Sequence, residues 1–334
     1  MNFVKKISKI FFILIILIFN SKIYANQIHI VKSEDGLYKG ELSDTINQIK
    51  EGYGIMNYSN GNIYSGEWKS GMKHGKGTMH YDDGTVYIGL WSFESRSGYG
   101  ETTSPNGEIY KGSYRVDYRN GFGKMIYSNG DVYNGQWINN SKYGKGIMNY
   151  ASKDTYEGQW QNDFIDGYGE RFYENGDIYK GQWTKNARDG NGEIIYFNGY
   201  SYKGSWKKGL RHGFGILKKN KNSFYSGQWN DDIRLGFGHE VFENEDVFIG
   251  YVNDKNFFRQ GIMRYTDSSK YLGGFLNDKI NGVGIFILPN GNKIKGNFRN
   301  GFFGEGIYKM DKITDFYYFL KFWNYKLLKY FSTK

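Results

Sequence analysis

Apolar and small residues alternate with polar ones in short stretches that recur along most of the chain. In one such stretch, Tyr64, Gly66 and Trp68 stand two positions apart with polar residues between them. Side chains two positions apart lie on the same face of an extended chain, so this spacing predicts a strand with one aromatic face. A second stretch, from Gly75 to Tyr81, again places small or apolar residues two apart. Each recurrence therefore predicts two short strands.

The recurrence has a fixed period of 23 residues. Eleven units follow one another at this period without an insertion. The aromatic or aliphatic residue that opens each unit is Tyr64 in the first and Ile294 in the last. Glycine follows two positions later in every unit, and a large aromatic residue follows two positions after that in most of them. A leading unit at Tyr38 is offset by 26 residues, which brings the total to about twelve. A fixed period of this length is typical of a repeat array.

Glycine pairs and turn residues complete each unit. A Gly-x-Gly pair such as Gly75/Gly77 follows the aromatic residue, and Asn-Gly or Asp-Gly separates many predicted strands, as at 60–61 and 129–130. These dipeptides favour a type I′ hairpin turn, in which two residues have positive φ. The other connection usually carries Gly, Asn or Asp three residues past the aromatic residue, as at Gly71. We expect an aromatic ring to cover the glycine of a neighbouring strand, which gives a single-layer sheet a packed face.

The pattern resembles the MORN repeat (membrane occupation and recognition nexus), whose signature reads Tyr-x-Gly-x-Trp, a short loop and Gly-x-Gly. The clearest unit runs from Tyr64 to Gly77, and the resemblance covers residues 38–308. It implies an all-β fold, namely an elongated, single-layer antiparallel β-meander of 23-residue hairpins. It also implies scaffolding, protein–protein adaptation, membrane attachment or dimerisation as roles. The units at 248–261 and 294–306 depart most from the signature, because they lack the Trp and part of the Gly-x-Gly pattern.

The N-terminal end of the chain differs from the array. Residues 1–25 place three lysines before ten apolar residues and end with small and polar residues at Ala25, which is the order of a secretory signal peptide. Ten residues fall short of the roughly 20 that a membrane-spanning helix needs. We therefore predict cleavage after Ala25, with an uncleaved anchor as the alternative, and a location that is periplasmic, secreted or at a membrane surface. A lead-in at 26–37 precedes the array, which we place at 38–310.

Residues 311–334 contain no glycine and predict a short C-terminal α-helix. Apolar residues recur there three and four positions apart, and five lysines accompany them. Three interpretations are open: the helix caps the last repeat, it lies on a membrane surface with its lysines toward anionic headgroups, or it binds a partner. The candidate residues for contact with a membrane or partner are Phe316, Lys321, Trp323, Lys326 and Lys329.

Composition and charge narrow the classes of function. The 334 residues include 47 glycines, 2 prolines and no cysteine, and 19% are aromatic. This aromatic content excludes a disordered linker, and the lack of cysteine excludes thiol nucleophiles and cysteine-ligated metals. The net charge of +10 becomes +6 without the four lysines of residues 1–25 (10 − 4 = 6). That excess suits an anionic surface without requiring one, and export leads us to expect no nucleic-acid partner.

No catalytic or metal-binding constellation is evident, so we predict no catalytic residue, no metal and no cofactor. His74 and His212 occupy the same repeat position six periods apart, too far to share a metal that needs three or four converging ligands. Carboxylates such as Asp131 and Asp177 recur with the period, which favours a turn or solvated role. A strand follows each Gly-x-Gly pair, whereas a dinucleotide-binding loop opens a helix.

The regularly spaced Tyr and Trp residues of the repeats, which we call the aromatic ladder, have two interpretations. The ladder is the core of a single-layer sheet, or it is also a curved face that stacks on sugars or receives a peptide. The candidate interaction face consists of Tyr64, Trp68, Tyr87, Trp91, Tyr133, Trp137, Tyr156, Trp160, Tyr179, Trp183, Tyr202, Trp206, Tyr225 and Trp229.

We predict a non-enzymatic exported scaffold or adaptor that binds an unknown protein partner, with a membrane surface as a candidate location and a homodimer as a candidate assembly. The alternative is a surface protein that binds anionic lipid or a glycan through the aromatic face and the basic C-terminal helix. A third hypothesis, an enzyme with a site in the irregular region 239–275, rests only on the loss of repeat character there.

Overall fold

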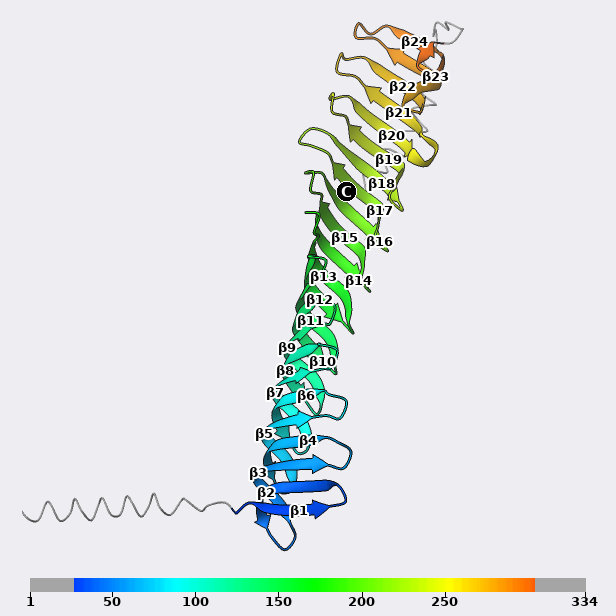
Figure 1. Cartoon of the computed structure of the whole chain (residues 1–334). Helices are drawn as coiled ribbons and strands as arrows, with labels where there is room; N and C mark the ends of the chain where they lie inside the picture. Colours follow the sequence, from blue (N-terminus) through cyan, green and yellow to red (C-terminus); the bar gives the residue numbers. More distant parts are fainter. Residues whose placement is uncertain (1–26, 304–334) are drawn as a thin grey trace, which may run out of the picture. The chain divides into compact units, whose positions relative to one another are not determined.

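The structure is a computed structural model that describes residues 27–303. The chain divides into two compact units, the first ending at Asp163 and the second beginning at Phe164. Within each unit, consecutive strands lie side by side in antiparallel order (Figure 1). The predicted signal peptide at 1–25 and the predicted C-terminal helix at 311–334 lie outside the described residues.

The described part of the first unit contains twelve strands. They are β1 (His29–Ser33), β2 (Gly36–Asp44), β3 (Ile49–Tyr58), β4 (Ile63–Lys69), β5 (Met72–His80), β6 (Val86–Ser92), β7 (Ser95–Thr103), β8 (Ile109–Arg115), β9 (Tyr118–Ile126), β10 (Val132–Ile138), β11 (Ser141–Asn149) and β12 (Thr155–Gln161). The sequence did not predict β1, which lies in the lead-in and pairs with β2 through His29 and Gly40.

The described part of the second unit continues the pattern with thirteen strands and one helical turn. They are β13 (Phe164–Phe172), β14 (Ile178–Thr184), β15 (Ala187–Ile195), β16 (Ser201–Lys207), β17 (Leu210–Lys218), β18 (Phe224–Asn230), β19 (Ile233–Val241), β20 (Val247–Asn253), η1 (Asp254–Asn256), β21 (Phe258–Arg264), β22 (Lys270–Leu276), β23 (Lys279–Ile287), β24 (Lys293–Arg299) and β25 (Phe302–Phe303). Among the described residues, no helix is long and apolar enough to cross a membrane.

Alternation along each strand separates two faces of the sheet. In β4, Tyr64, Gly66 and Trp68 are buried, whereas the residues between them are half-buried or exposed. The aromatic face is the one that carries Tyr64 and Trp68, and the outer face is the opposite one, which carries Ser65 and Glu67. The predicted all-β fold and its repeated hairpins are thus confirmed for the described residues.

A row of glycines runs across the strands of each unit on the aromatic face. Gly66 pairs with Gly54 of β3 and with Gly77 of β5. The Tyr64 ring lies over this row, because a methyl group added at Gly77 would come within 2.4 Å of the Tyr64 hydroxyl. That hydroxyl donates a hydrogen bond to the Glu67 carbonyl at 2.9 Å. The expected cover of ring over glycine is confirmed, and the tyrosine provides it.

The hairpins form where the sequence places them, but the turn types differ from the prediction. At the Asn-Gly connection between β3 and β4, the N–H of Gly61 donates to the Tyr58 carbonyl at 3.1 Å, and Gly61 is left-handed with φ 91°. Asn60 is not among the residues with positive φ. This is a type I turn followed by a left-handed glycine, which suits a three-residue loop. The prediction of type I′ turns at these dipeptides was wrong.

Type I′ geometry occurs at the other connection instead. Between β8 and β9, Val116 and Asp117 have φ of 47° and 67°, and the flanking residues Arg115 and Tyr118 pair directly. A two-residue loop favours this turn because its twist matches that of the strands. Gly, Asn and Asp recur at the second position because they tolerate positive φ most readily.

Candidate interaction surfaces

The aromatic face is a closed core in each unit. The Tyr64 ring lies 5.1 Å from the Trp68 ring and 5.3 Å from the Trp91 ring, both edge to face. This geometry, favourable for aromatic pairs, repeats from one hairpin to the next. No more than 4% of any of the fourteen side chains in the candidate interaction face is exposed. The rings are therefore core residues. Contact between them and a partner stays a prediction, and it requires the side chains that cover the rings to move.

Cationic side chains cover the ladder. In the first unit, Lys73 Nζ lies 4.9 Å from the centre of the Trp91 ring, and the Arg119 guanidinium lies 4.4 Å from that of Trp137. In the second unit, the Arg188 guanidinium lies 4.1 Å from the Trp206 ring. Such contacts are cation–π interactions. The cations that follow the 23-residue period are Lys50, Lys73, Arg96, Arg119, Lys142, Arg188, Arg211 and Arg234.

These cations were not among the predicted site residues, although the sequence carries a signal for them. A Lys or Arg stands two residues before the first glycine of most Gly-x-Gly pairs, as Lys73 does before Gly75. A charged residue is usually solvated, so its recurrence alone does not show that its stem packs on a ring.

Several of these cations are also held by the turn of the following hairpin. The Arg96 backbone N–H and Nε–H both donate to Asp117 Oδ1 at 3.0 Å. Burial alone would raise the pKa of Asp117, but these donors and the Arg96 charge outweigh it and hold that pKa below its usual value. Arg211 and Asp232 repeat the arrangement in the second unit at 2.7 Å. The left-handed turn residue therefore binds the same cation that covers the aromatic ring, so the two features form one motif.

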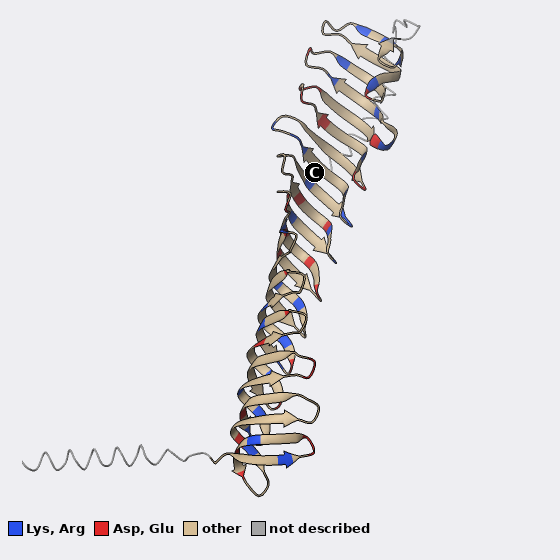
Figure 2. Ribbon diagram, viewed as in Figure 1, with Lys and Arg blue, Asp and Glu red and all other residues tan. Residues whose placement is uncertain are grey.

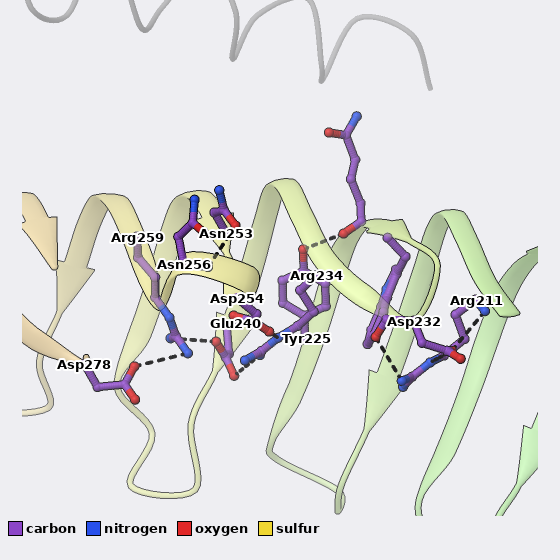
Figure 3. Close-up of polar contacts among 12 residues, drawn as sticks. Arg211, Tyr225, Asp232, Arg234, Glu240, Asn253, Asp254, Asn256, Arg259 and Asp278 are labelled. Carbon is purple, nitrogen blue, oxygen red and sulfur yellow. Dashed lines mark hydrogen bonds and ion pairs between the residues drawn. The ribbon is translucent and has the colours of Figure 1, made fainter. Parts of the chain in front are cut away.

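The ladder is interrupted in the second unit, where a charged cluster takes the place of apolar side chains (Figure 3). Val252 stands at the Trp position, and Glu240 stands where several other hairpins have Met. Glu240 is 6% exposed and accepts hydrogen bonds from Arg234 Nη1 at 2.7 Å and Arg259 Nη1 at 2.9 Å. Arg234 also donates through Nε to Asp254.

This cluster lies in the irregular region for which the enzyme hypothesis was raised. A general base must reach the proton that it removes, whereas both oxygens of Glu240 already accept hydrogen bonds from guanidinium groups. The geometry therefore favours a structural role for Glu240. Among residues 27–303, no group of three or more His, Asp or Glu side chains comes together as a metal site.

The recurring carboxylates have a turn role, as predicted. Asp131 Oδ1 accepts the N–H of Ala151 at 2.8 Å, and Asp177 Oδ1 accepts that of Phe197 at 2.9 Å. Lys and Arg are interspersed with Asp and Glu over the ribbons of both units (Figure 2).

The outer face carries large exposed rings, which the sequence analysis did not single out. Tyr99 and Phe122, each at the centre of a Gly-x-Gly pair, are 63% and 67% exposed. In the first unit, a groove of 610 Å³ is lined by Tyr53, Lys76, Ile88 and Tyr99. In the second unit, Tyr168, Lys180 and Lys203 line a similar groove of 500 Å³. The signal was the aromatic residue at the centre of several Gly-x-Gly pairs.

Comparison with known families identifies the array. The model of the MORN repeat matches ten segments, which together make up well over half of the chain. They are residues 49–63, 64–86, 87–109, 110–132, 133–155, 156–178, 179–199, 202–223, 225–247 and 271–293. The chain belongs to the MORN repeat family. Where about twelve units were expected, ten are matched, and the segments 248–270 and 294–306 that depart from the signature are not among them.

Solved structures to which the chain is similar include two related domains. One is the TCP10 domain of Danio rerio CPAP in complex with a peptide of Danio rerio STIL, at 15% identity over 68% of this chain and 99% of that chain, with a TM-score of 0.41. The other is the TCP domain of SAS-4 of Drosophila melanogaster in complex with a proline-rich motif of Ana2, at 17% identity over 60% and 90%, with a TM-score of 0.26. No curated protein matches the chain.

Proposed function

We propose that the chain is an exported, non-enzymatic MORN-repeat scaffold or adaptor that holds a protein partner on its outer face. One observation carries the proposal: the aromatic face is closed, whereas the outer face exposes most of the Tyr99 and Phe122 rings. Large exposed rings are enriched at protein–protein interfaces. A uniform array also repeats its geometry every hairpin, which suits a platform for binding.

The outer face has the mixed chemistry of such a platform. Strands β7 and β8 carry the Lys111–Glu101 ion pair at 3.0 Å next to the exposed Tyr99 ring. Rings supply contact area at low entropic cost, and surrounding charges fix the position of the partner more than they add affinity. A protein surface with an apolar centre and a charged rim fits this pattern.

A pair of matched variants tests the outer face. Tyr99→Ser combined with Phe122→Ser removes two exposed rings of the outer face, and Phe197→Ser removes a turn ring that is 80% exposed. Proteins captured by the tagged full chain in cells that make it are quantified by mass spectrometry. We expect a partner that the unchanged chain and Phe197→Ser capture equally and that the double variant loses. Equal capture by all three would contradict the proposal.

Export is the second part of the proposal. It is supported by the lysines, the apolar run and the small residues of positions 1–25. N-terminal sequencing of the protein recovered from outside the cytoplasm is expected to begin at Asn26. Recovery of the protein in the cytoplasm alone would overturn export. A chain recovered outside the cytoplasm that begins at Met1 would replace cleavage with a retained anchor.

Attachment to a membrane is the alternative that the basic residues of 311–334 support. Lysines beside apolar rings favour an anionic lipid surface, and five lysines stand in this segment. Flotation of the full chain with anionic and neutral vesicles, at low and high salt, tests it. Salt-sensitive flotation with anionic vesicles, lost when Lys321, Lys326 and Lys329 become glutamine, is the result that membrane attachment predicts. No flotation under any condition would exclude it.

A further inference from the structure

The outer face changes character in the second unit. Along β20 to β23, four aliphatic side chains stand in register, because Ile249 pairs with Ile262, Ile262 with Leu272, and Leu272 with Ile285. We call these four residues the aliphatic row. In the first unit, the same row across β7, β8 and β9 consists of Glu101, Lys111 and Lys124.

Exposure differs sharply between matched positions of the outer face. Leu272 and Ile88 occupy the same repeat position, yet Leu272 is 6% exposed and Ile88 is 56% exposed. Each has one neighbour on either side in the sheet, Ile262 and Ile285 for Leu272, and Thr78 and Glu101 for Ile88. A continuous aliphatic row on one face of a single-layer sheet is expected to pack against another element, because apolar area is stabilised by removal from water.

We infer that residues 304–334 of the same chain dock on the aliphatic row. This segment follows directly after β25, which pairs with β24, the strand next to β23. It has 31 residues (334 − 304 + 1 = 31) and apolar residues at helical spacing. Four strands span roughly 15 Å at about 4.8 Å per step, and about ten helical residues cover the same distance. The segment is therefore long enough to start beside β25 and lie across the row.

Charges of both signs lie at the rim of the aliphatic row. The turn between β19 and β20 exposes Glu243 and Glu245, and the turn between β21 and β22 exposes Asp267. These carboxylates lie at the ends of the strands that carry the aliphatic row. The ends of β21 and β22 also expose Arg264 and Lys270 on the same face. The length and position of the segment, rather than its charge, therefore favour it as the occupant. The docked segment covers repeats that have lost the tryptophan of the ladder, and its rings are then turned away from any membrane.

Thiol reactivity tests the docking, because the chain contains no cysteine of its own. Leu272→Cys reports on the aliphatic row, and Ile88→Cys is the matched control on the first unit. We expect a charged, water-soluble maleimide to modify Leu272→Cys about tenfold more slowly than Ile88→Cys in the full chain. Phe316→Asp with Leu320→Asp is expected to bring the two rates together without changing that of Ile88→Cys.

Three outcomes of this experiment would overturn the docking. They are fast modification of Leu272→Cys in the full chain, slow modification that the substitutions in 311–334 leave unchanged, and protection that disappears on dilution. The last outcome would assign the row to a second copy of the chain. The measurement requires no partner and no vesicle, so its failure is distinguishable from failure of the proposed function.

A photo-crosslinking residue at Trp323 provides an independent readout. The docking predicts crosslinks within one chain to peptides that contain β20 to β23. Crosslinks to another part of the chain, to a second chain in an isotopically mixed sample, or to added anionic vesicles in place of the strands would contradict it.

Discussion

The Arg211 guanidinium lies 4.2 Å from the centre of the Trp229 ring, and its Nε–H donates to Asp232 Oδ1 at 2.7 Å. One side chain thus joins the aromatic core of a hairpin to the turn that closes it. Equivalent cations recur with the 23-residue period in both units. A single-layer sheet has no second layer to cover its core, and these cations supply part of that cover.

Removal of this charge is predicted to weaken the second unit locally. Arg211→Met keeps an unbranched apolar stem over Trp229 but loses the cation–π contact and the ion pair, so we expect a loss of about 1 kcal/mol. Hydrogen exchange of the β17 and β18 amides measures the change. Arg115→Met, which alters an exposed arginine at the end of β8, is the control and is expected to have little effect. Unchanged exchange in Arg211→Met would show that the contact contributes nothing.

A methyl group in the glycine row is predicted to be far more harmful than a change in a turn glycine. Gly77→Ala places a Cβ 2.4 Å from the Tyr64 hydroxyl, and we expect a loss of about 3 kcal/mol from overpacking. Gly71→Asn is the matched control, because Gly71 has open space around it and other hairpins carry Asn140 or Asp117 at this position. Urea unfolding followed by tryptophan fluorescence compares the two variants. Equal losses would refute the close packing of ring on glycine.

The buried and half-buried tyrosines predict a loss of stability in alkali. Burial raises the pKa of Tyr127 and of Tyr271 to about 12, whereas an unfolded tyrosine titrates near pH 10. Between these values the unfolded chain releases protons that the folded chain keeps, so stability is constant below about pH 10 and falls as the pH rises toward 12. Tyrosinate absorbance and far-ultraviolet circular dichroism, followed together, check this. Full titration of the tyrosines near pH 10 with the fold intact would contradict it.

The charged cluster of the second unit is predicted to behave as a coupled set. Glu240→Met restores the residue type of other hairpins but leaves the Arg259 guanidinium without its buried partner, so we expect a loss of about 3 kcal/mol. Addition of Arg259→Leu is expected to recover most of that loss. Glu243→Met, at an exposed turn carboxylate, is the control for loss of charge. Additive losses in the Glu240 and Arg259 double variant, measured by urea unfolding, would show that the two residues are not coupled.

Much of the fold could be predicted from the sequence because the same residue spacing recurs from repeat to repeat. Residues two apart in Tyr-x-Gly-x-Trp must share a face, and eleven units without an insertion fix the hairpin length. The turn types were harder to predict from the sequence, because Asn-Gly suits both a type I′ turn and a type I turn with a left-handed glycine. The length of the loop decides which turn forms, and that length depends on where the two strands begin to pair. The left-handed Gly61 shows the result for the loop between β3 and β4.

The candidate surfaces were harder to predict than the fold. The spacing placed Tyr64 and Trp68 on one face, but it did not show that neighbouring cations close that face. Exposure depends on the residues of the adjacent strands, as Ile88 and Leu272 demonstrate at the same repeat position. Tyr99 and Phe122 of the outer face stand at the x position of Gly-x-Gly, which the repeat signature leaves variable.

Side-chain footprinting tests the central claim, that the outer face receives the protein partner while the aromatic face stays closed. Hydroxyl-radical oxidation of the chain is measured with and without the captured partner. The account predicts protection of the exposed rings of Tyr99 and Phe122 on binding, with Trp68 and Trp137 unreactive in both states because they are buried. Protection confined to the turns, with Tyr99 and Phe122 unchanged, would contradict the account, as would binding that makes the buried tryptophans reactive.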